Sequence, residues 1–245
     1  MAVFELFDED QNLLCSPCQA VIIVATYVAL VTKVGPYFMK NRPAFQLKEI
    51  LLVYNFVQIL LNALLCLQLL KLRPRGGYLC FRPLHKEDED LVDTLAVHYY
   101  YYILKIFDFM DTVFMVLRKK NNQVSFLHIY HHITTFAMAW YCGAYYPGGF
   151  AFYVGVGNTF VHSVMYLYYL VSSLQNKSVL WWKKYITILQ LVQHWILLFF
   201  AIVSLLNPHC DYSKILSGLG LCNMVVLIYF FTKFYVDNYL SHKDD

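Results

Sequence analysis

Three histidines lie close together in the segment QVSFLHIYHH, which runs from Gln123 to His132. His128, His131 and His132 are spaced so that all three imidazoles fall on one face of a helix. Near neutral pH an imidazole can act as a nucleophile, a general base or a metal ligand. A lone histidine in an apolar helix is usually a packing residue, whereas three on one face indicate a reaction site or a metal site.

A second polar stripe lies in the apolar segment 91–117, which carries Lys105, Asp108, Asp111 and Thr112. Their spacing places them along one side of a helix. A charge at the centre of a membrane helix costs about 3 kcal/mol on insertion scales, so each charge needs a partner or a function. Two structural alternatives stay open: Lys105 and Asp108 pair to lock helices together, and Asp111 with Thr112 belongs to a solvated helix end.

Two further segments carry polar side chains at helical spacing. They contribute Asn158, His162, Met165, Tyr166 and Tyr169, and then Thr187, Gln190, Gln193 and His194. The methionine and tyrosines alone would be typical of core packing, and amides often hold membrane helices together. Asn158 and His162 favour a functional site for the first group. For the glutamines, a functional role and a structural role both stay open.

The elements that must position these residues are membrane helices. The chain has 245 residues, 59% of them hydrophobic and 14% charged, where soluble domains have about a quarter charged. The sequence therefore predicts an all-α polytopic membrane protein, a single integral-membrane domain over 1–245 without a separate soluble catalytic domain. Since a span needs about 20 apolar residues, seven transmembrane helices are expected, at about 18–38, 48–71, 91–117, 123–143, 150–174, 184–206 and 214–236.

Charges and turn residues indicate how these helices are oriented. Of the 19 Lys and Arg residues, twelve fall on one face and six on the other, with Lys105 inside the third span. The positive-inside rule then places the C-terminus in the cytosol and the N-terminus outside or in a lumen. Gly35-Pro36, residues 147–149 and Asn207-Pro208 are typical of loops between spans. The net charge of +3 includes no basic block, which argues against nucleic acid as a partner.

Helix geometry places the polar stripes at a similar depth. With a rise of 1.5 Å per residue, His131 lies about 16 Å and Gln193 about 14 Å from the cytosolic ends of their spans. Lys105 lies about 20 Å from the same face, and His162 about 20 Å from the opposite one. In a hydrocarbon core of about 30 Å these residues share one slab, which predicts a reaction chamber inside the bundle.

Catalysis in this chamber could depend on a bound metal ion or on the side chains alone. A membrane di-iron oxygenase needs several clusters of ligands, but only four histidines share the slab and no glutamate accompanies them, so we expect no metal. No Ser or Cys lies directly beside His128, His131 or His132, so an acyl-imidazole is the natural covalent intermediate if one forms. The donors available to an oxyanion or enolate are Asn158, Gln190, Gln193 and Lys105.

These motifs resemble those of a known family. QVSFLHIYHH (123–132), NTFVHSVMYLYY (158–169) and TILQLVQ (187–193) are similar to the signature boxes of the elongation of very long chain fatty acids family, the membrane 3-ketoacyl-CoA synthases. LRKKNNQ (117–123) and GPYFMKNR (35–42) extend the resemblance, which covers roughly residues 16–240.

This chain departs from one of the family's signature boxes. In KxxExxDT, Lys105, Asp111 and Thr112 match, but Asp108 stands where glutamate is usual. Aspartate keeps the charge with a shorter reach, so the geometry of its pairing with Lys105 stays open.

The resemblance implies an acyltransferase that condenses a long-chain acyl-CoA with malonyl-CoA. The products would be CO2, CoA and a 3-ketoacyl-CoA two carbons longer. It also implies an endoplasmic reticulum enzyme without a cofactor, in which six of the seven helices surround a narrow substrate tunnel. A homodimer and the other enzymes of the elongation cycle are the expected protein partners. The preferred length and unsaturation of the acyl chain stay open.

The resemblance also implies roles for individual residues. His131, facing His162, is expected to take the acyl group from CoA, and His128 and His132 to orient or deprotonate it; Lys105 and Asp111 complete the catalytic set. The CoA-binding set is Arg118, Lys119, Lys120, Lys183, Lys184, Tyr166 and Tyr169. For the basic residues, simple positive-inside topology is the alternative.

Two other functional classes stay open. A His-box di-iron membrane desaturase or hydroxylase is the main alternative to the synthase. A seven-helix receptor or proton-coupled transporter could also hold His, Asp and Lys at mid-membrane, but it has no need of three histidines on one face.

The predicted orientation has consequences for the loops. It places Cys80 and Cys210 on the oxidising side, where we expect them to form a disulfide, with Cys15 and Cys18 as competing partners. It places the acceptor sequence Asn176-Lys-Ser178 in the cytosol, where it should carry no glycan. Lys243 lacks the second lysine of a dilysine signal, so the natural chain could extend past Asp245.

Overall fold

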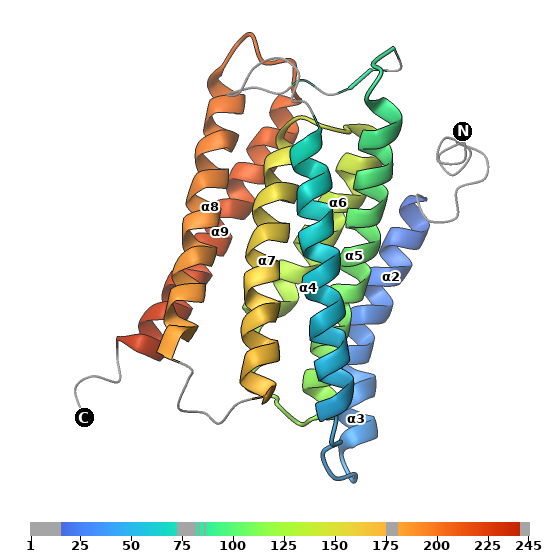
Figure 1. Cartoon of the computed structure of the whole chain (residues 1–245), viewed down its shortest axis with the longest axis vertical. Helices are drawn as coiled ribbons and strands as arrows, with labels where there is room; N and C mark the ends of the chain where they lie inside the picture. The colour runs from blue at the N-terminus through green and yellow to red at the C-terminus, as the bar shows by residue number, and fades with distance from the viewer. Residues whose placement is uncertain (1–15, 73–81, 83, 86, 175–180, 241–245) are drawn as a thin grey trace. The chain divides into compact units, whose positions relative to one another are not determined.

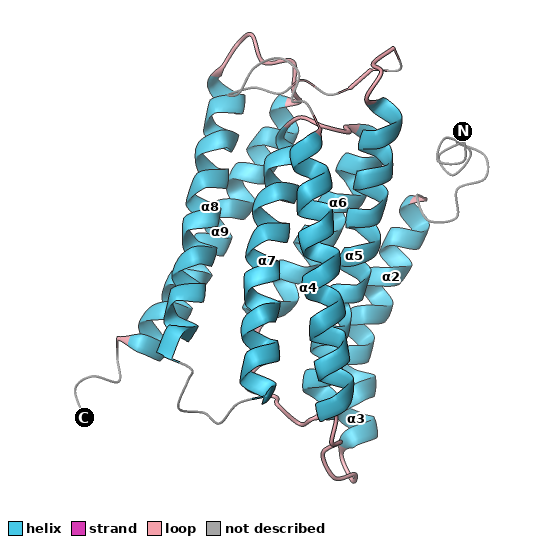
Figure 2. Ribbon diagram, viewed as in Figure 1, coloured by secondary structure: helices cyan, strands magenta, loops and turns pink. Residues whose placement is uncertain are grey.

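The computed structural model describes residues 16–72, 82, 84–85, 87–174 and 181–240. Within these ranges every regular element is a helix, which confirms the predicted all-α class (Figures 1 and 2). The chain forms two compact units. The first unit comprises Met1–Leu47 and Lys86–Pro147, and the second comprises Lys48–His85 and Gly148–Asp245.

The first unit is built around two long helices, α5 (Leu91–Leu117) and α6 (Phe126–Tyr145), which pack against each other. The N-terminal helix joins them in three parts: α2 (Pro17–Ala29), the π-helical turn η1 (Leu30–Val34) and α3 (Gly35–Met39). Its α2 part contacts α6, and its η1 and α3 parts contact α5.

Gly35 and Pro36 lie inside this N-terminal helix, as the predicted span 18–38 required, and do not form the loop that the pair itself indicates. Proline removes one helical hydrogen bond and its ring clashes with the preceding turn. The wider π-helical turn directly before Pro36 absorbs this misfit, because the Gly35 N–H bonds to the carbonyl of Leu30, five residues back. The helix therefore runs from Pro17 to Met39 without a break.

Helix α6 begins three residues later than predicted, at Phe126 and not at residue 123. The Ser125 hydroxyl caps it by accepting the backbone N–H of His128 at 3.2 Å. Serine is a favoured cap because it satisfies one of the free N–H groups at a helix start. Gln123 consequently lies outside the helix, exposed.

The second unit consists of α4 (Lys48–Lys71), α7 (Phe150–Leu174), α8 (Lys183–Leu206) and α9 (Lys214–Tyr239). Helix α4 packs against α7, α7 against α8, and α8 against α9. Asn207 ends α8, and Gly148 and Gly149 precede α7 with positive φ angles of 87° and 57°, as expected of turn residues.

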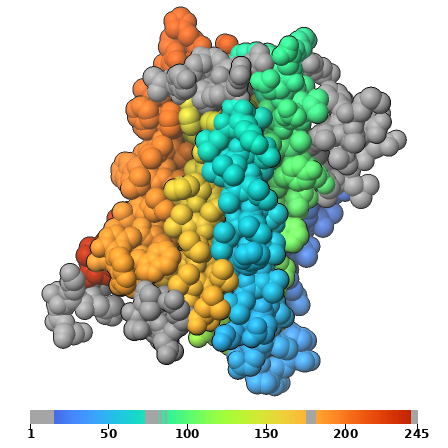
Figure 3. Space-filling model, in the orientation of Figure 1, coloured from blue at the N-terminus to red at the C-terminus, as the bar shows by residue number. Residues whose placement is uncertain are grey.

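Helix α4 has its polar side inside and its apolar side outside. The buried residues include Asn55, Gln58 and Asn62. Its outer surface, the band of residues 48–71 in Figure 3, exposes large side chains, among them Val53 at 65% and Leu64 at 57%. Water would not stabilise such a surface, whereas lipid would.

Four helical stretches in the described residues are long and apolar enough to cross a membrane: Pro17–Met39, Lys48–Lys71, Lys183–Leu206 and Lys214–Tyr239. The protein is thus a multi-pass membrane protein. Helices α5, α6 and α7 are 27, 20 and 25 residues long, long enough by length alone, but their charged, imidazole and amide groups lower their hydropathy. That they also span the bilayer, giving seven spans in one integral-membrane domain, stays a prediction.

Candidate active site

The structure brings the three histidines of α6 together. The rings of His128 and His132 lie 4.3 Å apart between centroids, and those of His131 and His132 lie 5.6 Å apart. His132 is buried, and the other two are half-buried. These three residues are called the histidine face below.

Aromatic side chains of α5 and α6 form the surroundings of the histidine face. Phe109 contacts the ring of His132 edge-on at 6.3 Å and the ring of Phe136 at 5.4 Å, and Tyr102 lies 5.3 Å from Phe136. Phe136 is fully buried. Such packing excludes water, and polar interactions made in a low-dielectric environment are stronger than in water.

One hydrogen-bonded chain reaches the histidine face from the other helices of the first unit. The hydroxyl oxygens of Tyr27 and Thr112 lie 2.8 Å apart, and the Thr112 oxygen lies 2.9 Å from Nε2 of His128. Thr112 is fully buried, so the solvated helix end considered for it in the sequence is wrong. Asp111, its neighbour, is half-buried.

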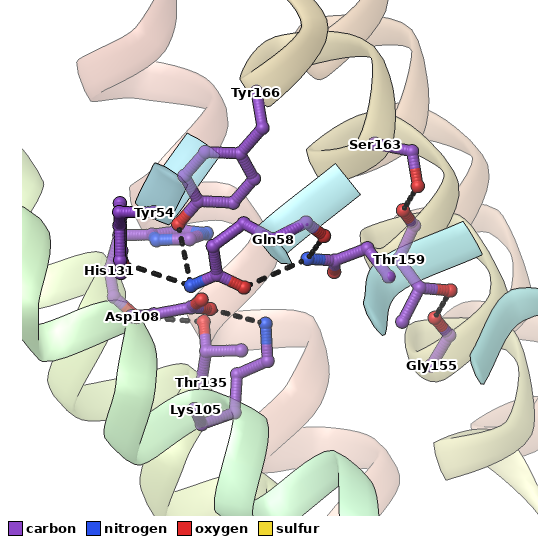
Figure 4. Close-up of polar contacts among 11 residues, drawn as sticks. Tyr54, Gln58, Lys105, Asp108, His131, Thr135, Gly155, Thr159, Ser163 and Tyr166 are labelled. Carbon is purple, nitrogen blue, oxygen red and sulfur yellow. Dashed lines mark hydrogen bonds and ion pairs between the residues drawn. The ribbon is translucent and has the colours of Figure 1, made fainter. Parts of the chain in front are cut away.

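Lys105 and Asp108 form an ion pair of 2.7 Å, with only 2% and 1% of their side chains exposed (Figure 4). The shorter aspartate therefore reaches the lysine. Because the two residues lie three apart on α5, the pair lies within one helix and does not by itself lock two helices together. The ammonium also lies 4.9 Å from the centre of the Tyr101 ring, a cation–π distance.

In the second unit, the predicted residues of α7 are mostly buried. Asn158, His162 and Tyr166 are 3%, 5% and 0% exposed. The rings of His162 and Tyr166 meet edge-on at 5.8 Å, and the half-buried Tyr169 lies 6.0 Å from Tyr166. A buried amide, imidazole and phenol thus follow one another along this helix.

Helix α4 supplies a polar group that the sequence analysis missed. The Gln58 amide donates to the hydroxyls of Tyr54 at 2.9 Å and Tyr166 at 3.4 Å (Figure 4). The Asn62 amide donates to the backbone carbonyl of Gln58 at 2.9 Å. Gln58 and Asn62 are 1% and 0% exposed. The signal was the spacing of Asn55, Gln58 and Asn62 by three and four residues in an otherwise apolar span.

The glutamines of α8 have different surroundings. Gln190 is half-buried and its amide lies 3.8 Å from the sulfur of Met165, whereas Gln193 is buried next to Gly157 of α7. His194 bonds through Nδ1 to the Gln190 carbonyl and packs on Phe231 at 4.9 Å. His194 is therefore held by its own helix and by α9.

The predicted CoA-binding lysines lie at helix ends. Lys119, Lys120, Lys183 and Lys184 are exposed, and Arg118 is half-buried. Lys119 adopts a positive φ of 56°, and the N–H groups of Lys119 and Lys120 bond back to Val116 and Met115, which closes the end of α5. The structure brings Arg118, Lys119 and Lys120 onto one turn. Their contact with CoA stays a prediction.

The remaining predicted sites concern metal ligands and cysteines. Across the described ranges, no group of three or more His, Cys, Asp or Glu side chains is arranged to hold a metal ion. Cys210 is disulfide-bonded, but Cys80, its predicted partner, lies outside the described residues, as do Cys15 and Asn176 to Ser178. The Cys80 to Cys210 pairing therefore stays a prediction.

Comparison with known proteins supports the resemblance of the motifs. The family model of the GNS1/SUR4 family matches residues 12–245. The chain is 35% identical over 238 residues to very long chain fatty acid elongase 4 of Mus musculus, covering 96% of this chain and 76% of the mouse protein. It is 37% identical over 240 residues to a very long chain fatty acid elongase of Aedes aegypti, covering 96% of this chain and 67% of that protein.

A third relative is very long chain fatty acid elongase F of Drosophila melanogaster, 38% identical over 230 residues, with 88% of this chain and 86% of the relative covered. The match to the family model takes in α2 to α9, including the histidine face and the buried Lys105–Asp108 pair. The chain therefore belongs to the GNS1/SUR4 family, the elongation of very long chain fatty acids family.

Proposed function

We propose that this protein is a very long chain fatty acid elongase, an acyltransferase that joins a long-chain acyl-CoA to a two-carbon unit from malonyl-CoA. The products are a 3-ketoacyl-CoA, CO2 and CoA. The observation that carries the proposal is the histidine face: three imidazoles within ring-contact distance on a helix of a multi-pass membrane protein. The names of the relatives support the class of substrate.

In the first half-reaction, an unprotonated nitrogen of His131 attacks the thioester carbonyl of the acyl-CoA. The C–S bond breaks, CoA leaves as a thiolate that takes up a proton, and the other nitrogen of His131 gives up its proton to a neighbouring imidazole. His131 suits this role because it is only half-buried, whereas His132 is buried. His162 is proposed as its partner in the reaction.

In the second half-reaction, malonyl-CoA loses CO2 and the remaining thioester enolate attacks the acyl carbonyl. The bond to His131 breaks, and His131 regains its proton. Negative charge develops first on the enolate oxygen and then on the attacked carbonyl oxygen, and amide and ammonium donors stabilise it. Asn158, Gln190, Gln193 and Lys105 are proposed as these donors, with Asp111 assisting and Asp108 holding Lys105 in place at 2.7 Å.

We also propose an arrangement of the helices and a CoA-binding site for this reaction. Six helices surround a narrow tunnel that holds the acyl chain, and CoA binds at the cytosolic end through Arg118, the four lysines at the ends of α5 and α8, and Tyr166 with Tyr169. The enzyme resides in the endoplasmic reticulum membrane with its N-terminus in the lumen. No metal or other cofactor takes part.

The test is a malonyl-CoA-dependent extension assay on the purified full-length protein. We expect a 3-ketoacyl-CoA two carbons longer than the acyl-CoA supplied, and loss of this product in the His131→Gln variant. The control is His209→Gln, because His209 is an exposed loop residue outside the proposed site. Equal activity of both variants, or oxidation of the acyl chain that needs added iron, would contradict the proposal.

A further inference from the structure

The N-terminal helix, which carried no candidate residue in the sequence analysis, sends one hydroxyl toward the histidine face. Tyr27 of α2 is 4% exposed, and its ring stacks on Phe109 of α5 at 4.1 Å with an interplanar angle of 12°. This stacking fixes the direction of its hydroxyl, which lies 2.8 Å from the hydroxyl of Thr112. Both residues belong to the first unit, as does the histidine face.

Thr112 connects this phenol to an imidazole. Its oxygen lies 2.9 Å from Nε2 of His128, and Thr112 has no exposed surface. The three polar atoms therefore form a chain from α2 through α5 to α6. Since the Thr112 hydroxyl carries only one proton, it can donate to Tyr27 or to His128, but not to both.

The chemistry of the groups favours one direction for the chain. A phenol is a better donor than an aliphatic hydroxyl, and the unprotonated nitrogen of an imidazole is a better acceptor than a hydroxyl oxygen. Tyr27 then donates to Thr112, and Thr112 donates to Nε2 of His128. A neutral His128 must in that case carry its proton on Nδ1, because the tautomer is set by the bond that the other nitrogen makes.

We propose that Tyr27 is a positioning residue that acts through Thr112 to hold His128 in its neutral Nδ1–H tautomer. The lone pair of Nε2 is occupied and Nδ1 carries the proton, so His128 has no free nitrogen with which to remove a proton. His128 accordingly orients its neighbours in the histidine face, while deprotonation of His131 falls to another imidazole. This consequence for catalysis rests on the proposed function, but the tautomer of His128 does not.

The direct test is ¹⁵N NMR of the full-length protein labelled at histidine, in lipid nanodiscs without substrate. His128→Gln identifies the His128 signals by their loss. In the wild type we expect the protonated-nitrogen signal at Nδ1. Tyr27→Phe, which keeps the stacking on Phe109, should give a mixture of tautomers, and Thr112→Ser should preserve the wild-type state because it keeps the hydroxyl.

The control for Tyr27→Phe is Tyr37→Phe in the same N-terminal helix, whose side chain is 82% exposed. It should leave the His128 signals unchanged. A proton on Nε2 in the wild type would overturn the inference, and so would the same tautomer ratio in wild type and Tyr27→Phe.

Kinetics provide a second readout that a purely structural role would not move. We expect Tyr27→Phe to lower kcat for 3-ketoacyl-CoA formation about threefold to tenfold, the usual effect of one lost hydrogen bond, with an unchanged KM for acyl-CoA. Tyr27→Phe combined with Thr112→Val should be no slower than Thr112→Val alone, because both break the same chain. Additive losses would contradict the hydrogen-bonded chain.

If the wild type forms no 3-ketoacyl-CoA, the proposed function fails while the NMR result still decides the tautomer.

Discussion

A lysine and an aspartate are buried together in α5 with almost no exposed surface. Each charge alone would be strongly unfavourable there, and the 2.7 Å contact makes them tolerable. The Tyr101 ring adds an attraction for the ammonium at 4.9 Å. The pair therefore fixes the position of the ammonium, as the proposed role of Lys105 as a donor requires.

Replacing Asp108 tests how far Lys105 depends on this partner. Asp108→Asn removes the negative charge that lies next to a buried ammonium and should destabilise the protein by about 3 to 5 kcal/mol. Asp108→Glu keeps the charge and adds one methylene in a packed site, so its cost should be smaller, about 1 to 3 kcal/mol. Thermal unfolding in detergent measures both. Equal unfolding temperatures for Asp108→Asn and the wild type would show that the pair contributes nothing to stability.

Sequence spacing was enough to place the histidine face and the Lys105–Asp108 pair, because residues three and four apart on a helix become neighbours. The same rule could have found Gln58 and Asn62, which we overlooked among apolar residues. The chain from Tyr27 to His128 could not have been found this way. Its first step joins Tyr27 and Thr112, which are 85 positions apart, and only the packing of α2 and α5 brings their hydroxyls together.

At the scale of elements, the N-terminal helix shows how local strain depends on a neighbour. A Cβ atom on Gly35 would lie 2.7 Å from the Leu30 carbonyl oxygen and 2.8 Å from a methyl carbon of Val116 on α5. Both distances are shorter than real contacts allow. Glycine is thus needed where the π-helical turn meets α5.

Gly35→Ala should consequently destabilise the protein by about 1 to 3 kcal/mol, as overpacking does. Gly218→Ala in α9 is the matched control, since a Cβ there meets nothing within 4 Å. It should be neutral or stabilising by up to about 1 kcal/mol, because alanine favours helix over glycine. Unfolding temperatures of the two variants in the same detergent provide the comparison. A shift of the same sign for both would contradict the packing of Gly35.

Helix positions followed well from the alternation of apolar runs and charged breaks, but two details did not. The start of α6 moved from residue 123 to Phe126 because Ser125 provides the cap. The Gly35-Pro36 pair indicates a loop, because it usually interrupts helices, although the predicted span 18–38 contains it. A π-helical turn that accommodates proline leaves little trace in sequence, since it depends on how the helix packs.

At the scale of the whole molecule, the central prediction is its orientation in the membrane. The excess of Lys and Arg on one face predicts that Cys80 and Cys210 are lumenal and that Asn176 is cytosolic. A Cys80 to Cys210 disulfide would close a loop of about 130 residues, worth on the order of 5 kcal/mol in the chain-entropy model. In the described part of the chain Cys210 is disulfide-bonded, whereas Cys18, Cys66, Cys142 and Cys222 form no disulfide.

Peptide mapping without reduction should recover the Cys80 and Cys210 peptides joined, and Asn176 should carry no glycan when the protein is made in eukaryotic cells. Mapping after reduction provides the control for peptide recovery. Alkylation of Cys80 before reduction would exclude this pairing. A glycan on Asn176 would invert the topology and with it the cytosolic entrance for CoA.

The covalent mechanism requires that His131 takes the acyl group before malonyl-CoA arrives. The measurement is mass spectrometry of the purified protein after incubation with acyl-CoA alone, together with an assay of free CoA. Gln193→Leu should still be acylated but extend slowly, because an enolate donor acts only in the second half-reaction. We predict an acyl mass on the peptide that contains His131 and His132, with one CoA released for each acyl group bound. Release of CoA only after malonyl-CoA is added, with no acylated peptide, would contradict the covalent intermediate.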